Sequence, residues 1–142
     1  MGYERKYTLM YKCPCCQKPA PHAVIDVQNV RQAVQADQLT EKDIFKRTYI
    51  GHGLQSSVFV FQGHKGKFRK HVHVTHDEIG YVLSGSGKVL IGEEVREVNS
   101  GDVWIIPANT PHGGEFESEP VEVLFVSSPV DDPENPDRIW LD

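Results

Sequence analysis

The chain has few cysteines, no long apolar run and no excess of positive charge. Its three cysteines, Cys13, Cys15 and Cys16, crowd into four positions, so none has a distant partner for a disulfide that would staple the fold. No stretch approaches the roughly 20 apolar residues that span a bilayer, and residues 1–12 contain no apolar signal core. We therefore expect a cytoplasmic protein with no membrane partner.

The balance of charge argues against a polyanionic partner. The formal net charge is −5 and the isoelectric point about 5.8, and no basic run is interleaved with aromatic residues. Such a surface does not attract a phosphate backbone, so nucleic acid is a poor candidate. With 142 residues, 25% of them charged and 39% hydrophobic, the chain has the size and composition of one soluble globular domain.

The composition and the spacing of apolar residues divide the chain into three parts. Residues 1–48 are mixed: residues 7–11 suit a short strand, and residues 27–46 carry apolar side chains at loosely helical spacing. We interpret this part as an N-terminal arm with some helix. Residues 49–128 form the main domain. Residues 129–142 hold three prolines, which exclude a central strand, so this tail is expected to pack on the outside, anchored by Trp140.

The main domain reads as all-β. Short apolar runs alternate with segments rich in glycine, proline, asparagine and aspartate, the pattern of a multi-stranded barrel or sandwich. Loops this short imply antiparallel neighbours. The runs predict strands at residues 57–61, 68–74, 79–83, 88–91, 95–98, 103–106 and 121–127.

A pair of histidines marks the second of these strands. Because side chains alternate along a strand, His71, His73 and Thr75 share one face and Val72 and Val74 the other. Two imidazoles about 7 Å apart on one face can reach the same metal ion. On its own the pair is a weak signal, because histidines at this spacing also occur by chance, and it favours two solvated surface histidines over a metal site.

Further residues follow the pair at a regular spacing. Four residues separate His73 from Glu78, and six more separate Glu78 from Gly85. Upstream, Gly66 precedes His71 by four intervening residues. Downstream, Gly101 is followed after five residues by Pro107, and His112 lies five places beyond.

These two motifs, in this order, resemble those of the cupin superfamily, in particular its small single-domain, metal-binding members. Three departures stand out: the first gap is one residue short, Asn109 replaces a glycine, and Phe116 replaces the closing asparagine. Asparagine also tolerates positive φ, so the change at Asn109 is mild. The resemblance covers residues 49–127.

The resemblance implies an all-β fold, a jelly-roll-like double-stranded β-barrel, with one metal ion. Carried over by position, it implies four metal ligands, His71, His73, Glu78 and His112. Three imidazoles and one carboxylate suit a divalent ion, with Fe(II) favoured and Zn(II), Mn(II) or Ni(II) as alternatives. In an octahedral shell this set leaves two positions open for other ligands.

Two residues beside Glu78 complicate the assignment. Strict alternation from His73 turns Asp77 inward, so Glu78 becomes the ligand only if the turn holds one extra residue; its spacing to Gly85 favours Glu78. His76 lies in the same turn. We interpret it as a residue at the rim rather than a fifth ligand, with a possible role as a proton shuttle. His76 and Asp77 are therefore the catalytic candidates.

The substrate-facing candidates are the side chains expected to line the cup: Thr75, Gly80, Val82 and Phe116. Gly80 carries two interpretations. An inward glycine beside the metal opens space for a substrate, since related barrels carry a bulky apolar residue there. Alternatively, the glycine serves a strand bulge.

The cysteine cluster stands apart from these motifs. Cys13 and Cys16 have the gap of half a zinc knuckle, and His22 follows six residues after Cys16, but no second cysteine pair completes a four-ligand site. A metal site, a redox site and an ordinary reduced turn stay open here.

The expected function is that of a metal-dependent enzyme acting on a small oxygen-bearing organic substrate. A mononuclear non-haem metal dioxygenase is slightly favoured, because three histidines and a glutamate suit redox-active iron. A non-redox isomerase, lyase or polyketide-cyclase-like enzyme is the first alternative, and a barrel that binds a small molecule without turnover is the second. We also expect a homodimer, with the N-terminal arm as a strand donor.

Overall fold

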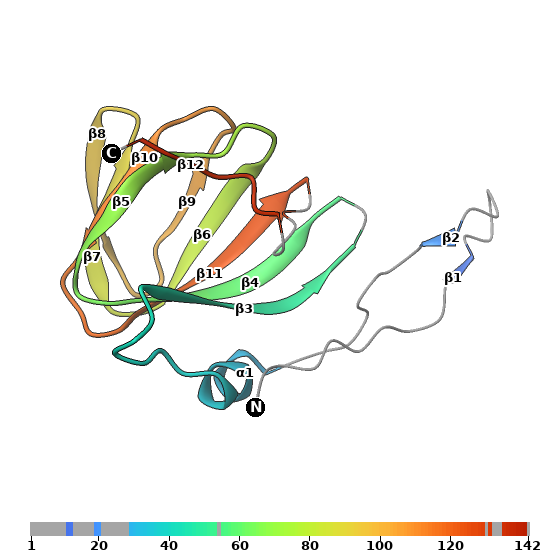
Figure 1. The fold of residues 1–142 in the computed structure, drawn as a ribbon, viewed down its shortest axis with the longest axis horizontal. Coiled ribbons are helices and arrows are strands. Elements are labelled where there is room, and N and C mark those ends of the chain that lie inside the picture. The colour runs from blue at the N-terminus through green and yellow to red at the C-terminus, as the bar shows by residue number, and fades with distance from the viewer. Residues whose placement is uncertain are drawn as a thin grey trace.

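Two five-stranded antiparallel sheets face one another in the computed structural model (Figure 1). The structure describes residues 11–12, 19–20, 29–53, 55–129, 131 and 135–141. The first sheet has the order β3-β4-β11-β6-β9 and the second the order β12-β5-β10-β7-β8. The chain therefore crosses repeatedly between the sheets, and the two histidine-bearing strands, β5 and β10, become neighbours.

The strands are short, as the spacing of turn residues predicts. The first sheet comprises β3 (Phe45–His52), β4 (Ser57–Gly63), β6 (Asp77–Ser84), β9 (Val103–Ile106) and β11 (Val121–Ser128). The second comprises β5 (Gly66–Val72), β7 (Ser86–Ile91), β8 (Glu94–Asn99), β10 (His112–Phe116) and β12 (Ile139–Trp140). Before them come β1 (Tyr11–Lys12), β2 (Pro19–Ala20) and one helix, α1 (Val30–Ala36).

The space between the sheets is filled by apolar side chains. Phe59 and Phe61 of β4 pack with Val121 and Val123 of β11 in one buried cluster. A second cluster joins Val82, Val89 and Val98. Burying each such side chain stabilises the fold by roughly 1.5–3 kcal/mol. The second cluster joins the two sheets directly, and Phe68 and Phe116 of the second sheet pack against the first cluster.

The all-β prediction is confirmed, and all seven expected strands are present within a few residues of their expected bounds. Three strands of the two sheets were missed, as was the short strand β2. β3 begins at Phe45, ahead of the expected boundary at residue 48, β10 has two central glycines, and β12 has only two residues. None of the three shows a clear apolar alternation, because pairing with long neighbours rather than local pattern defines them.

The predicted helix is much shorter than expected. It spans only Val30–Ala36, with Asn29 as its N-cap: the side-chain oxygen accepts a hydrogen bond from the backbone N–H of Gln32 at 3.1 Å. The prediction was wrong for the second half of residues 27–46, since Phe45 onwards pairs with β4. Among the described residues, no helix is long and apolar enough to cross a membrane.

The cysteine cluster and most of the strand expected at residues 7–11 lie outside the described residues. Of that strand, Tyr11 belongs to β1, which pairs antiparallel with β2. The alternatives for Cys13, Cys15 and Cys16 therefore stay predictions.

The motif glycines occupy turns that need them. Gly66, Gly85 and Gly101 have φ of 118°, 91° and 95°. This backbone conformation is energetically costly for any residue that carries a side chain. Asn109, which replaces a glycine in the second motif, also has positive φ, 64°. The expectation that asparagine substitutes for glycine at this turn is confirmed.

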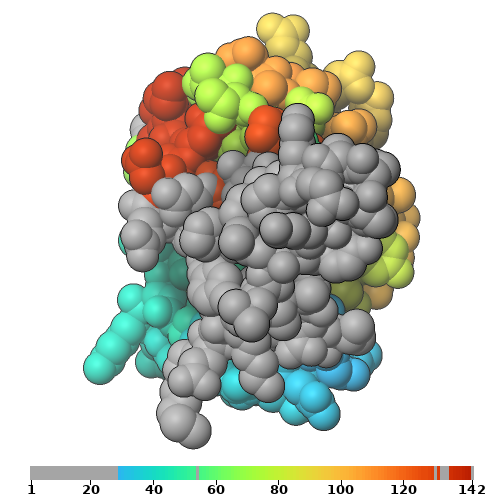
Figure 2. Space-filling view, turned by 90° about the vertical axis from the view of Figure 1, so that its right-hand side faces the viewer, coloured from blue at the N-terminus to red at the C-terminus, as the bar shows by residue number. Residues whose placement is uncertain are grey.

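Near the C-terminus, β12 forms an edge strand of the second sheet. Ile139 and Trp140 pair with Val72 and His71 of β5, and the backbone N–H of Leu141 donates to the carbonyl of Lys70 at 3.0 Å. In the space-filling view the red C-terminal residues lie at the opposite end of the visible face from the blue helix α1 (Figure 2). The tail thereby comes next to the histidine strand.

Candidate metal centre

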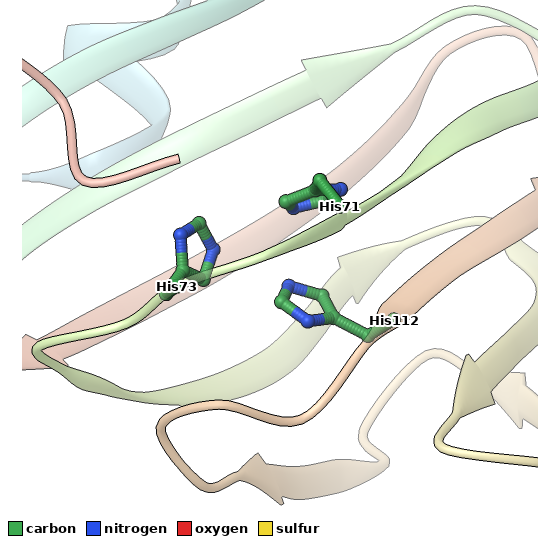
Figure 3. Close-up of side chains that lie close together, drawn as sticks. All are labelled: His71, His73 and His112. Carbon is green, nitrogen blue, oxygen red and sulfur yellow. The ribbon is translucent and has the colours of Figure 1, made fainter. Parts of the chain in front are cut away.

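Three of the expected ligands converge on one point between the sheets (Figure 3). His71 lies in β5 and His73 directly after it, while His112 opens β10 and stands opposite His71 in the register of the two strands. All three are buried, and one ring nitrogen of each lies within 4.8 Å of those of the others. The alternation predicted for His71 and His73 therefore does bring both imidazoles to the interior.

Each of these imidazoles is held by its Nδ1 atom. The Nδ1 atoms of His71, His73 and His112 lie 2.8, 2.5 and 2.9 Å from the backbone carbonyl oxygens of Arg69, Asp137 and Thr110. Because a carbonyl oxygen only accepts, each Nδ1 carries the proton and donates. Each Nε2 is then left with a lone pair directed into the cluster, the arrangement found in metal-binding histidines.

The fourth expected ligand comes from the opposite sheet. Glu78 opens β6, is 6% exposed, and has its Oε2 atom 3.3 Å from Nε2 of His73 and its Oε1 atom 3.9 Å from Nε2 of His112. Asp77, its neighbour, is exposed and accepts a hydrogen bond from the backbone N–H of Ala108 at 2.8 Å. The turn therefore contains the extra residue that the motif spacing required.

The protonation states suit a cation. Burial lowers the pKa of His71 to about 3 and also lowers the pKa of His112. Burial on its own raises the pKa of Glu78, but the adjacent imidazoles of His73 and His76 outweigh it and hold that pKa well below its usual range. Neutral imidazoles beside an ionised carboxylate are the forms that bind a metal.

The residues present fit a divalent metal ion. Nε2 of His73 and Nε2 of His112 are buried and have no hydrogen-bond partner, which is rare for buried polar atoms and typical of a site built for a ligand. Three nitrogen donors and one carboxylate suit Fe(II), Mn(II), Ni(II) and Zn(II) alike. The His/Glu cluster, by which we mean His71, His73, Glu78 and His112, can thus hold one ion.

From the sequence we placed His76 at the rim of the site, and this interpretation was wrong. Its side chain is 1% exposed and stacks on His73, with ring centroids 4.3 Å apart. Its Nε2 atom lies 4.0 Å from Oε2 of Glu78 and has no hydrogen-bond partner. Burial lowers the pKa of His76, but nearby Glu78 and Asp137 reverse this and raise it. β5 ends at Val72, so the alternation of side chains between the two faces stops there. The turn that follows folds His76 inward.

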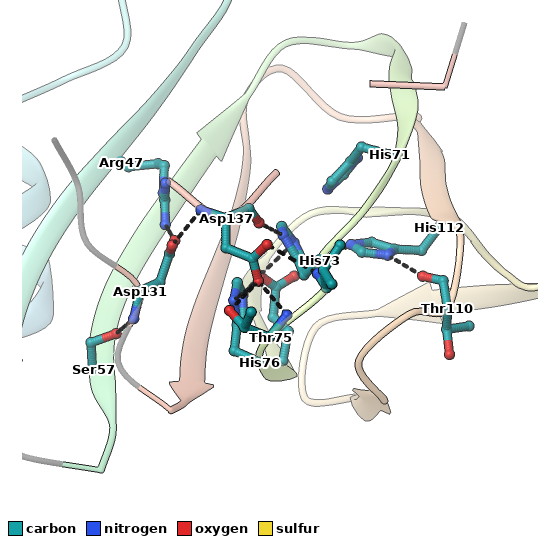
Figure 4. A network of polar contacts seen from close by, with 12 residues as sticks. Arg47, Ser57, His71, His73, Thr75, His76, Thr110, His112, Asp131 and Asp137 are labelled. Atoms are coloured by element: carbon teal, nitrogen blue, oxygen red, sulfur yellow. Dashed lines mark hydrogen bonds and ion pairs between the residues drawn. The ribbon is translucent and has the colours of Figure 1, made fainter. Parts of the chain in front are cut away.

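Asp137 is a site residue that the sequence analysis missed. Its carboxylate accepts hydrogen bonds from the backbone N–H of Val74 and Thr75, from the Thr75 hydroxyl and from Nδ1 of His76, at 2.7 to 3.0 Å (Figure 4). Burial raises its pKa, but the hydrogen bonds from Thr75 and Val74 outweigh this and lower it. Asp137 thereby fixes the turn between His73 and Glu78.

A second carboxylate supports the first. The backbone N–H of Asp137 donates to Oδ1 of Asp131 at 3.1 Å, and Oδ2 of Asp131 pairs with Arg47 at 2.5 Å. Asp131 is buried. The C-terminal segment is thus tied to β3 as well as to the histidine turn. Arg47 and Asp131, which bind each other, are 84 positions apart in the chain. No local sequence pattern therefore reveals this network.

A cavity opens beside the His/Glu cluster, with a volume of about 60 Å³. Its walls are mostly aromatic: Phe45, Phe59, Phe61, Phe68, Trp104 and Phe116. Two guanidinium groups, Arg47 and Arg138, join them. The cavity therefore offers a water-poor surrounding to the cluster and is suited to a small molecule.

Of the four predicted substrate-facing residues, only Phe116 lines this cavity. Val82 is buried in the second apolar cluster. Thr75 points outward and binds Asp137, because the strand has already ended. The catalytic candidate Asp77 is likewise on the outer face.

Gly80 neither opens space nor serves a bulge at positive φ. It pairs with Trp104 across β6 and β9, and a Cβ at this position would lie 2.5 Å from Cζ2 of that indole. Its backbone φ is not in the positive range. Both interpretations of Gly80 were wrong: the absent side chain makes room for Trp104, whose Nε1 atom is buried without a hydrogen-bond partner.

Comparison with known proteins places this site in a family. The chain is 40% identical over 60 residues to the uncharacterized protein MJ1618 of Methanocaldococcus jannaschii, a match that covers 42% of this chain and 48% of that protein. The chain spans about half the length of the curated relatives that it matches.

Solved structures share the fold. KdgF from Halomonas sp. superposes with a TM-score of 0.63 at 24% identity, covering 70% of this chain and 93% of that one. Pac13, described as a nucleoside dehydratase, superposes with a TM-score of 0.61 at 19% identity, covering 76% and 87%. At these identities the likeness shows the fold alone.

The match to a family model is direct. The model described as the cupin domain matches residues 57–127, half of the chain, and this range includes β4 to β10, nearly all of β11 and all four members of the His/Glu cluster. Together with the glycine turns and the two motifs, this match shows that the chain belongs to the cupin family.

Proposed function

We propose that this chain is a metal-dependent cupin enzyme that acts on a small oxygen-bearing organic substrate. The observation that carries the proposal is the set of three imidazoles whose Nδ1 atoms are all bound to backbone carbonyls, with the Nε2 atoms of His73 and His112 lying 3.3 and 3.9 Å from the carboxylate of Glu78. Such a preorganised cluster beside an apolar cavity is typical of a reaction site.

A divalent ion held there supplies Lewis-acid chemistry, or redox chemistry if it is iron. The chain itself contributes the rest. The aromatic walls exclude water and strengthen electrostatic interactions inside the cavity. Asp137 keeps the rings of His73 and His76 oriented, and the unpartnered Nε1–H of Trp104 is a hydrogen-bond donor for a substrate oxygen.

Within this proposal, a mononuclear iron dioxygenase is the favoured reaction class, because a three-histidine, one-carboxylate set suits redox-active iron. A non-redox reaction is the second candidate. It is favoured by the likeness to Pac13, since a dehydratase needs no oxidant. The expected homodimer stays a prediction.

Anaerobic loading with Fe(II) and then with Zn(II) separates these candidates. The protein is offered a panel of small catechols, β-diketones and hydroxy acids, and oxygen uptake and product formation are followed by electrode and NMR. The Fe(II)-loaded protein should consume oxygen with at least one compound, and its His73→Ala variant should not. Product formation with Zn(II) in the absence of oxygen would favour the non-redox candidate, and binding without product the binding protein.

A further inference from the structure

Arg138 lies in the cavity wall between two aromatic rings. Its guanidinium carbon is 5.2 Å from the ring centroid of Phe45 and 4.6 Å from that of Trp140. Stacking on aromatic faces fixes the plane of a guanidinium group but leaves its N–H donors, which lie in that plane, free for another partner. The group is therefore oriented without being neutralised.

The second guanidinium of the cavity is a useful contrast. Arg47 forms an ion pair with Asp131, so its charge is compensated inside the chain. Arg138 forms no side-chain hydrogen bond and no ion pair with any residue in the described part of the chain. Burial, together with the nearby charge of Arg47, lowers the pKa of Arg138. A half-buried cation without a carboxylate partner is unfavourable unless something else pairs with it.

The net charge of the site with a metal ion bound also favours an additional negative partner. A divalent ion and the two arginines carry more positive charge than the three carboxylates around them, Glu78, Asp131 and Asp137. Low-dielectric aromatic walls strengthen this imbalance. An anionic ligand compensates it, and a carboxylate matches the planar fork of a guanidinium group.

The position of Arg138 relative to the cluster is fixed from both sides. The preceding residue, Asp137, holds His73 through its backbone carbonyl. The following residues, Ile139 and Trp140, pair with Val72 and His71 of β5. The same short segment thus sets both the orientation of the imidazoles and the place of the unpaired cation.

We propose that Arg138 binds the carboxylate of a small organic acid while another oxygen of that molecule faces the His/Glu cluster. This assignment rests on the proposed function and narrows its substrate class. A single unpaired guanidinium matches one negative charge, and a cavity of about 60 Å³ suits a small ligand. A carboxylate therefore fits this site better than a doubly charged phosphate group.

Binding to the Zn(II)-loaded protein, which is redox-silent, tests the proposal. Glycolate, 3-hydroxypropionate and 4-hydroxybutyrate are titrated by calorimetry against their uncharged amides, with inorganic phosphate as a further probe. At least one acid should bind about tenfold or more tightly than its amide, as expected for a charge-assisted pair. Equal affinities of every acid and its amide would overturn the proposal, and so would tighter binding of phosphate than of any acid.

Two variants make the test specific. Arg138→Gln should abolish the preference for the acid while the zinc content stays unchanged. Arg96→Gln removes another arginine, an exposed one on β8 that pairs with Glu94, and should leave the preference intact. A preference that survives in Arg138→Gln would contradict the assignment.

A measurement on the metal-free wild type separates this proposal from the metal site. The Nε–Hε NMR resonance of Arg138, identified by its absence in Arg138→Lys, should shift on titration with acetate and not with acetamide. A protein that binds no metal but shows this shift would refute the proposed function and retain the anion site. A resonance that ignores acetate, in a protein that does bind zinc, would refute the role of Arg138 alone.

Discussion

The Nδ1 atom of His73 lies 2.5 Å from the backbone carbonyl oxygen of Asp137, 64 positions later in the chain. The carboxylate of the same aspartate accepts hydrogen bonds from the next three residues, Val74, Thr75 and His76. One residue of the C-terminal segment therefore orients a candidate ligand and fixes the turn that leads to Glu78. The orientation of the ligand therefore depends on hydrogen bonds to a distant segment and not on the metal ion alone.

Asp137→Asn is expected to weaken metal binding about 10–100-fold, the usual effect of losing a hydrogen bond that orients metal ligands. The amide keeps the size of the side chain but has one acceptor oxygen in place of two and no charge for His76. Zinc affinity measured by competition with a chelator checks this. Asp102→Asn is the control, because Asp102 also accepts a backbone hydrogen bond, from Asn99, in a turn between β8 and β9. Equal affinities of the two variants would contradict the role of Asp137.

A pair of adjacent carboxylates provides a second comparison. Glu78→Gln should reduce metal affinity strongly, because the buried oxygens near His73 and His112 become a neutral amide. Asp77→Asn should change it little, since that side chain is exposed and binds Ala108. Metal content after dialysis measures both. The opposite ranking would show that the inward carboxylate is Asp77.

The fit of Gly80 against Trp104 predicts a loss of stability. In Gly80→Ala the new Cβ meets the indole at 2.5 Å, and the tryptophan must move. Overpacking of this kind costs about 1–3 kcal/mol of unfolding free energy, which lowers the melting temperature. Gly53→Ala is the control, because a Cβ there meets no atom within 4 Å. If both variants melt together with the wild type, Trp104 does not depend on Gly80.

Acid should destabilise the metal-free protein through His71. Burial lowers its pKa from 6.5 to about 3, so between these values the unfolded chain binds a proton at His71 that the folded chain does not. The contribution of neutral His71 to the free energy of unfolding is therefore complete above pH 6.5, and it is lost as the pH falls through this range. Urea unfolding at pH 7 and pH 5.5, with a chelator present, should show a smaller decrease in His71→Gln than in the wild type. Identical decreases would contradict the assignment.

The sequence predicted those parts of the site that depend on local geometry. His71 and His73 share a face because strands alternate. Glu78 lies at motif spacing between turns with positive φ at Gly66 and Gly85, and His112 follows such turns at Gly101 and Asn109. Strand alternation failed where the strand ended: Thr75 turned out and His76 turned in. The period of the side chains is informative only inside a regular element.

The missed residues owe their place to long-range pairing. Asp137 and Arg138 lie in an irregular segment, which reaches the cluster through the pairing of β12 with β5 and through Asp131. The signal in the sequence was Trp140, which was predicted to anchor the tail but not to position functional side chains. Gly80 likewise depends on its register with Trp104 of another strand, which no local pattern reveals.

Metal content of the purified protein tests the central claim most directly. Elemental analysis should find about one divalent ion per chain in the wild type, because the two groups of closely spaced donors, one with His71, His73 and His112 and the other with His73, His76 and Glu78, share His73. His73→Ala and His112→Ala should each lose the metal yet keep a folded barrel by circular dichroism, since apolar burial holds the sheets together. His64→Ala, which alters a half-buried histidine paired with Glu119, should retain the metal. Full metal content in both cluster variants would contradict the account.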